Sequence, residues 1–156
     1  MNKRHISRIL GLSAEFRAAI EVTPRSNLPI TFENFPRGSC GDAILLLAKF
    51  LEENECGSFH CVLGEREERS HAWLEQCDLI VDITGDQFAD MPHPVFVKRR
   101  SRWHASFNGK RQYVADFDIF DEYTRVRLRA AYNVVLHNLN ALRAHLGPRL
   151  DCSLPF

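Results

Sequence analysis

The chain has 156 residues, of which 45% are apolar, enough for one ordinary hydrophobic core, so we expect a single domain over 1–156. It carries 20 basic and 20 acidic residues, so no overall field draws it toward nucleic acid or an anionic membrane. Five cysteines in irregular spacing argue against a closed disulfide framework and for thiols kept reduced in a cytosol.

No segment of the sequence predicts secretion or membrane insertion. The residues after the charged start Met1 to His5 mix apolar side chains with Ser, Arg and Gly, unlike a signal peptide. The longest purely apolar run, Ala43 to Ala48, is far shorter than the ~20 residues that a bilayer requires. We expect a cytoplasmic protein. Delivery into another cell and the oligomeric state stay open, because neither leaves a trace in such a sequence.

The first third of the chain predicts helix followed by an irregular segment. Apolar residues from Ile6 to Ile20 follow helical spacing, which predicts one or two helices. Pro24, Pro29 and Pro36 then predict a loop that leads into residues 37–42. A long ordered loop that enters a helix is typical of functional loops.

The next predicted helix runs from about Cys40 to Glu53. Ser39 is a plausible N-cap, and Asp42 lies where the acidic residue of a capping box reaches back. The apolar side chains form a stripe wide enough to be buried: Ala43, Ile44, Leu47, Phe50 and Leu51.

Strand-like segments follow this helix. Three short runs are predicted as strands: Phe59 to Leu63, Ser70 to Glu75, and Leu79 to Ile83. Farther on, Pro94 to Lys98 and a hairpin signal at Asn108-Gly109 predict more antiparallel sheet.

The last third predicts a long helix from about Asp121 to Leu146, which Gly147 and Pro148 end. The order is then helices, a buried central helix, a mostly antiparallel sheet and a terminal helix. This order places the protein in the α+β class.

Cys40 is placed where a cysteine becomes a nucleophile. The first turn of a helix stabilises negative charge on sulfur through the macrodipole and unpaired backbone N–H groups. The Cys40 N–H could also face a developing oxyanion, and Gly38 and Gly41 allow a substrate backbone to come close. The alternative is a buried and inert core thiol, which is the common state of a lone cysteine.

His71 and Asp82 are predicted to meet across a hairpin. If Gln76-Cys77 is a two-residue loop, His71 lies directly opposite Asp82 with Cβ atoms only ~5 Å apart. The alternative is an ordinary cross-strand ion pair at a half-exposed surface. The alternating residues form one apolar face and leave His71 and Asp82 on the other: Ala72, Leu74, Leu79, Val81 and Ile83.

Together these residues supply a nucleophile, a base and a group that orients the base. Their segments are Gly38-Ser39-Cys40-Gly41-Asp42-Ala43, His71-Ala72-Trp73-Leu74-Glu75 and Val81-Asp82-Ile83-Thr84-Gly85-Asp86-Gln87-Phe88. They resemble the transglutaminase-like branch of the papain-like superfamily, and the last two look most like small bacterial papain-fold toxin and effector domains. The resemblance, over about a third of the chain, implies catalytic Cys40, His71 and Asp82 and a catalytic sheet packed on the cysteine-bearing helix.

The same resemblance implies three further site residues. Asn34 stands six residues before Cys40, similar to the glutamine whose amide helps to bind the oxyanion in the family. The alternative for Asn34 is a turn before Phe35-Pro36. Gln87 matches the family motif after the aspartate, where packing and backbone bonding are the alternative to a substrate-binding role. Trp73 could wall the cleft or fill it.

The predicted function is a cysteine acyl-transfer hydrolase that acts on a protein or peptide, with glutamine deamidation favoured and no cofactor or metal. A cysteine protease, a crosslinking enzyme and a non-catalytic binding module on the same fold are the alternatives. A metal site built from Cys56, Cys61, His71 and Cys77 is disfavoured, since no close Cys-x-x-Cys pair is present.

A basic run could grip an acidic partner, although such runs are more often solvated loops. Its members are Lys98, Arg99, Arg100 and Arg102, with Lys110 and Arg111 nearby.

Overall fold

A computed structural model describes residues 1–147, which form four α-helices and one five-stranded sheet. The helices are α1 (Lys3–Val22), α2 (Cys40–Glu53), α3 (Arg102–Ala105) and α4 (Glu122–Leu146). The strands are β1 (His60–Arg66), β2 (Arg69–Gln76), β3 (Leu79–Asp82), β4 (Phe96–Arg99) and β5 (Lys110–Val114). The strand order is β4-β3-β2-β1-β5 and every neighbouring pair is antiparallel. The α+β class and the long C-terminal helix are therefore confirmed.

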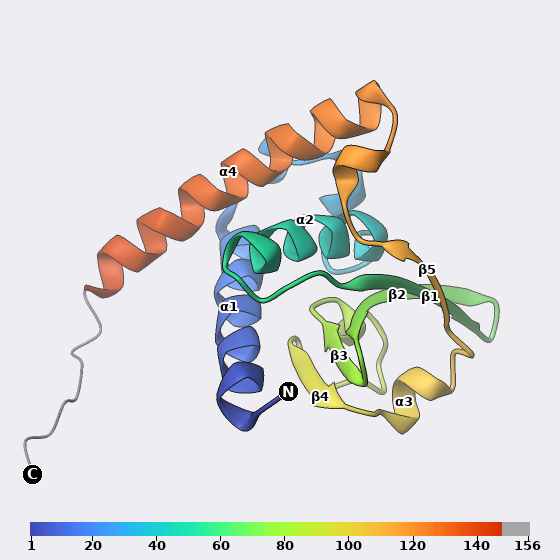
Figure 1. Cartoon of the computed structure of the whole chain (residues 1–156). Coiled ribbons are helices and arrows are strands. Elements are labelled where there is room, and N and C mark those ends of the chain that lie inside the picture. The colour runs from blue at the N-terminus through green and yellow to red at the C-terminus, as the bar shows by residue number, and fades with distance from the viewer. Residues whose placement is uncertain (148–156) are drawn as a thin grey trace, which may run out of the picture.

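The helix α2 lies at the centre of the fold, between the sheet and α4, and α1 stands beside both (Figure 1). It is buried around most of its circumference, from Ala43 to Ala48 and again at Phe50 and Leu51. A helix that is apolar on nearly all sides is stable only when other elements cover it from several directions. The predicted range of this helix is confirmed at both ends.

The start of α2 differs from the predicted capping box. Ser39 makes no side-chain cap bond, and its hydroxyl donates to the Pro36 carbonyl at 2.9 Å. Asp42 accepts hydrogen bonds from Thr31 at 2.6 Å and from Arg127 of α4 at 2.7 Å. The predicted capping box was wrong because the Asp42 carboxylate is hydrogen-bonded to Thr31 and Arg127 and not to the backbone of Ser39.

The β2–β3 hairpin has a different register from the predicted one. The paired residues are Leu74 with Val81, Glu75 with Ile80 and Gln76 with Leu79. The loop is therefore Cys77-Asp78, with Cys77 at φ 55°. His71 and Asp82 are therefore diagonal neighbours and not direct partners. The observed register differs from the predicted one by two residues, so both side chains still lie on the same face.

The sheet has two buried faces of different character. The face toward α2 is aliphatic and joins the main core through Ala72, Leu74, Leu79, Val81 and Val97. The opposite face carries a smaller cluster: Val62, Trp73, Ile80, Phe88 and Phe107, with Phe96 and Trp103 packed against it. The side chains of His71 and Asp82 belong to this second face and are also buried.

The additional antiparallel sheet predicted after Pro94 is confirmed by β4 and β5, but the hairpin predicted at Asn108-Gly109 was wrong. The dipeptide connects α3 to β5, and β5 pairs with β1 at the far edge of the sheet from β4. Gly109 is needed for a different reason, since a Cβ there would stand 2.5 Å from the Trp73 ring. No helix within residues 1–147 has the length and apolar character needed to cross a bilayer.

Candidate functional site

Cys40 is the first residue of α2 and is only partly exposed. Gly38, at φ 75°, turns the chain into the helix, which places the thiol beside β2. Burial on its own would raise the pKa of the Cys40 thiol, but hydrogen bonding and charge from His71, with the backbone N–H groups of Ala72 and Gly41, lower it overall. The β2–β3 ladder ends at Leu74–Val81, and Ala72 lies just beyond that end.

His71 lies in β2 with no exposed surface. Its Nε2 is 2.6 Å from Asp82 Oδ2, so Nε2–H donates to the carboxylate and Nδ1 is left for the thiol side. Burial disfavours the charged ring, yet the Asp82 hydrogen bond and the Cys40 sulfur together raise the pKa of His71 to about 9. The contact between Cys40 and His71 thus lowers the pKa of the thiol and raises that of the imidazole.

Asp82 ends β3 and is fully enclosed. Its Oδ1 accepts the Thr84 backbone N–H at 2.8 Å, while Oδ2 accepts from His71 and from His104 at 2.9 Å. Burial opposes the charge, but the hydrogen bonds from His104 and His71 hold the pKa of Asp82 far below its usual range. A buried carboxylate with this many donors remains ionised.

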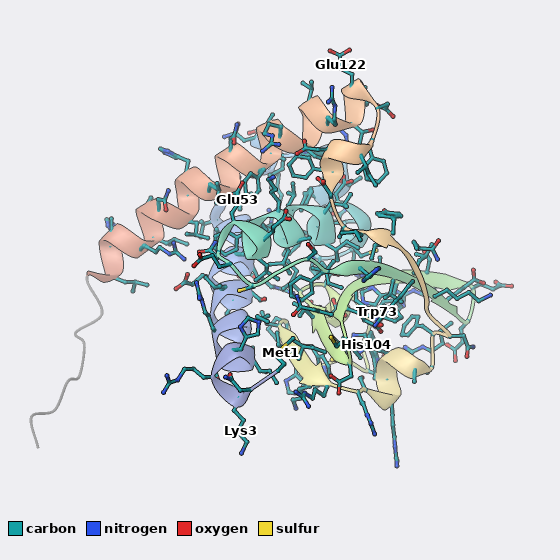
Figure 2. The ribbon with its side chains drawn as sticks, viewed as in Figure 1. Met1, Lys3, Glu53, Trp73, His104 and Glu122 are labelled. Carbon is teal, nitrogen blue, oxygen red and sulfur yellow. The ribbon has the colours of Figure 1, made fainter. Side chains whose placement is uncertain are left out.

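His104, from α3, is the member of the site that sequence reasoning missed. It is 1% exposed, and its ring centroid lies 5.1 Å from that of Trp73. Figure 2 labels the two residues next to each other. Ser101 precedes it by three residues, and its Oγ accepts the His104 backbone N–H at 3.1 Å and lies 2.8 Å from His104 Nδ1. The Ser-x-x-His spacing fits a helix N-cap, but nothing in the sequence brings that cap to Asp82.

The order Ser101, His104, Asp82 repeats the pattern of nucleophile, histidine and carboxylate. The Ser101 hydroxyl is already engaged as the side-chain cap of α3, where it holds both the backbone and the ring of His104. Its local role is therefore to fix the ring, and Cys40 is the better nucleophile of the two.

Gln87 lies next to the reacting side of His71. Its Nε2 donates to the Thr84 carbonyl at 3.1 Å and lies 3.3 Å from His71 Nδ1. One contact of the amide is therefore the backbone bond that the alternative role predicts. The other contact is with the His71 ring. Contact with substrate remains a prediction for this residue.

The loop after Asp82 is fixed by a buried arginine. Arg17 of α1 donates to the Ile83 carbonyl at 2.7 Å and to the Pro94 carbonyl at 2.8 Å, and binds both oxygens of Asp86. Bidentate guanidinium–carboxylate contacts combine energy with geometric definition. This clamp from α1 sets the path of the chain that carries Thr84 and Gln87.

Trp73 is buried, whereas Asn34 is exposed. Trp73 is 2% exposed and donates to Glu75 Oε1 at 3.1 Å, so it mainly fills the second face of the sheet. Asn34 lies in an exposed turn closed by a 2.8 Å bond from the Arg37 N–H to its carbonyl. It lines a hollow of about 680 Å³ with Phe35, Arg37 and Gly38. An oxyanion role for Asn34 stays a prediction.

His71, Asp82 and His104 are also the one group within residues 1–147 whose donor atoms converge as metal ligands would. Metal ligands lie ~2.0–2.2 Å from the ion, which keeps two ligand atoms about 3 Å or more apart. The 2.6 and 2.9 Å separations here are those of hydrogen bonds. Cys56, Cys61 and Cys77 do not join this group.

Part of the basic run is paired. Arg99 lies 3.7 Å from Asp78, and Arg111 binds Glu75 at 3.2 Å. These contacts favour the solvated-surface alternative for those two arginines.

No protein-family model matches this chain, and no curated protein or solved structure matches it.

Proposed function

We propose that the protein is a cysteine hydrolase of papain-like fold that acts on amide bonds of a protein substrate through Cys40, His71 and Asp82. The observation that carries the proposal is the place of Cys40 at the start of α2, beside a histidine whose other nitrogen is held by a buried carboxylate. These surroundings lower the pKa of the Cys40 thiol. A thiol that is inert in a core has its pKa raised by burial, as the thiols of Cys56 and Cys61 do here.

In the first half of the reaction the Cys40 thiolate attacks the carbonyl carbon of the amide. The oxyanion can be received by the backbone N–H groups of the first turn of α2, which have no partner within the helix. Asn34 and Gln87 are the candidates for a side-chain donor. When the C–N bond breaks, the imidazolium of His71 gives its proton to the leaving nitrogen, and a thioester remains on Cys40.

In the second half water attacks the thioester carbon and His71 takes a proton from it. The C–S bond then breaks, which restores the thiolate and releases a carboxylic acid that loses its proton to solvent. Asp82 holds the ring in the tautomer that presents Nδ1 to the sulfur and stabilises the imidazolium, and it stays ionised throughout.

The burial of the site favours a slender substrate group. His71 is fully buried and Asp82 is 1% exposed, so only Cys40 of the three is reached from outside. A glutamine carboxamide at the end of its flexible side chain reaches such a thiol more readily than a peptide bond within a folded backbone. Deamidation is therefore the reaction that we propose, with water as the acceptor.

The test is mass spectrometry of a protein mixture after exposure to wild type and to Cys40→Ala. Deamidation appears as a gain of about one dalton at a glutamine and the release of ammonia, both absent with Cys40→Ala. Backbone fragments with new termini would establish a protease, and lysine-linked products a crosslinking enzyme. If a broad mixture gives none of these products, the non-catalytic binding module becomes the better account of the fold.

A further inference from the structure

Asp82 serves two histidines through one oxygen. Oδ2 lies 2.6 Å from Nε2 of His71 and 2.9 Å from Nε2 of His104, while Oδ1 accepts from Thr84. A triad needs only one of these two histidines. His104 therefore shares with His71 the lone pairs of Asp82 Oδ2.

The proton of His104 can be assigned from its neighbours. Ser101 Oγ accepts the His104 backbone N–H, so its own hydroxyl hydrogen is free to donate to Nδ1. Nδ1 is then an acceptor, and the neutral ring carries its hydrogen on Nε2, where it points at Asp82. Ser101 therefore fixes the tautomer that makes His104 a donor to the carboxylate.

His104 cannot turn away from Asp82. Its ring centroid lies 4.8 Å from those of both Phe96 and Trp103, and 5.1 Å from that of Trp73. Close-packed aromatic rings leave no alternative position for an imidazole that is 1% exposed. The contact with Asp82 is thus a permanent part of the site.

We propose that His104 is a positioning residue of the cysteine centre, which holds Asp82 Oδ2 and limits how strongly that oxygen stabilises the His71 imidazolium. Through His71 it sets the fraction of Cys40 present as thiolate at a given pH. This inference rests on the proposed function, since it assigns His104 to the same catalytic group.

Other charged groups lie near His104 on its outer side. A hollow of about 380 Å³ is lined by His104 and Ser101 and by Glu75, Asp78 and Arg100. Glu75 is held by Trp73 and Arg111, and Asp78 faces Arg99. These groups are the same in every variant below, so a difference between variants reports the His104 contact.

The experiment measures the rate of iodoacetamide alkylation at Cys40 against pH, by mass spectrometry of its peptide, in three proteins. His104→Leu removes the donor and keeps the bulk, which frees Asp82 for His71 and stabilises the imidazolium–thiolate pair. We expect its midpoint to move to lower pH and its rate at about pH 5.5 to rise several-fold over wild type. His104→Gln keeps an N–H donor and is expected to stay near the wild-type profile.

Ser101→Ala provides a second test if His104→Leu does not fold. It leaves the imidazole in place but removes the hydroxyl that fixes its tautomer, so a smaller shift in the same direction is expected. Equal midpoints in wild type, His104→Leu and Ser101→Ala, or a shift to higher pH, would overturn the positioning role and leave the proposed function standing. A wild-type Cys40 that does not react below neutral pH would overturn both.

Discussion

The two faces of the sheet are built from neighbouring residues of the same strands, yet one buries apolar side chains and the other buries charged groups. Leu74 and Val81 enter the main core against α2, to which β2 and β3 contribute only aliphatic side chains. His71 and Asp82 enter a smaller aromatic cluster that also receives His104. The first face supplies apolar burial. The second hides charge, at a cost that only a complete set of hydrogen bonds offsets.

The difference shows how a small domain can hold a buried charged group. The aromatic rings give the second face enough bulk to exclude water, and the indole N–H of Trp73 is bonded to Glu75 and does not compete for Asp82. Each oxygen of Asp82 has at least one donor, and both nitrogens of His104 have partners. Low local dielectric strengthens these bonds, and it would penalise any that were lost.

Changing one residue on each face of β3 tests most strongly whether the two faces have different roles. Asp82→Asn preserves the shape but disrupts the tautomer of His71, so we expect turnover to fall by about 10³–10⁴-fold. Val81→Ala, the adjacent residue on the aliphatic face, should lose stability while the folded fraction keeps near-normal turnover. Ammonia release from a protein mixture measures both, and comparable turnover of Asp82→Asn and wild type would contradict the account.

Leu74→Ala tests the aliphatic face alone. Leu74 has no exposed surface, so truncation should lower the free energy of unfolding by about 2–5 kcal/mol through lost burial and a cavity. Urea denaturation measures this loss. The pH profile of Cys40 alkylation should be unchanged, and a displaced profile would show that the two faces are not separate in function.

The pH dependence of stability should come from the second face. The pKa of Asp82 is lowered by folding, so its stabilising contribution is present above about pH 4 and is lost as the pH falls below that value. The pKa of His71 is raised to about 9, so its contribution is full below about pH 6.5 and is lost as the pH rises through 9. Folding also lowers the pKa of Cys40, so the contribution of this thiol grows as the pH rises and opposes the loss at His71. The acid side therefore carries the clearest pH dependence, and wild type should lose stability as the pH falls below about 4.

Asp82→Asn should flatten the acid side of this curve. The part removed should amount to about 1–3 kcal/mol, measured by urea denaturation at a series of pH values. Val81→Ala is the control and should retain the wild-type slope at lower overall stability. An unchanged acid slope in Asp82→Asn would place the acid sensitivity elsewhere in the protein.

The smallest predicted effect concerns Gln87, whose amide lies 3.3 Å from His71 Nδ1. An N–H donor at that nitrogen favours the neutral ring over imidazolium. Gln87→Met should therefore increase Cys40 alkylation at about pH 5.5 by a few-fold. Gln112→Met, at an exposed glutamine bonded to Lys110, is the matched control. Slower alkylation in Gln87→Met would reverse the role that we give this amide.

The sequence allowed some of these features to be predicted, and the physical reasons differ. Local periodicity predicts the start of α2 at Cys40 and places His71 and Asp82 on the same face of the sheet. A register shifted by two residues does not change that face. The register itself was wrong because Cys77, not glycine or asparagine, adopts the positive φ of the turn. His104 lies on a four-residue helix that crosses between the two edges of the sheet, and no short-range pattern predicts such a contact.

The most direct test of the central claim compares Cys40 with Cys77 in the same protein. Cys77 is exposed in the β2–β3 turn, so accessibility alone favours its reaction, whereas Cys40 is only partly exposed. At about pH 5.5 a limiting amount of iodoacetamide should label Cys40 first, because the thiolate and not the thiol is the nucleophile. In His71→Gln this preference should disappear. Labelling of Cys77 ahead of Cys40 in wild type, with no change in His71→Gln, would contradict an activated cysteine at the start of α2.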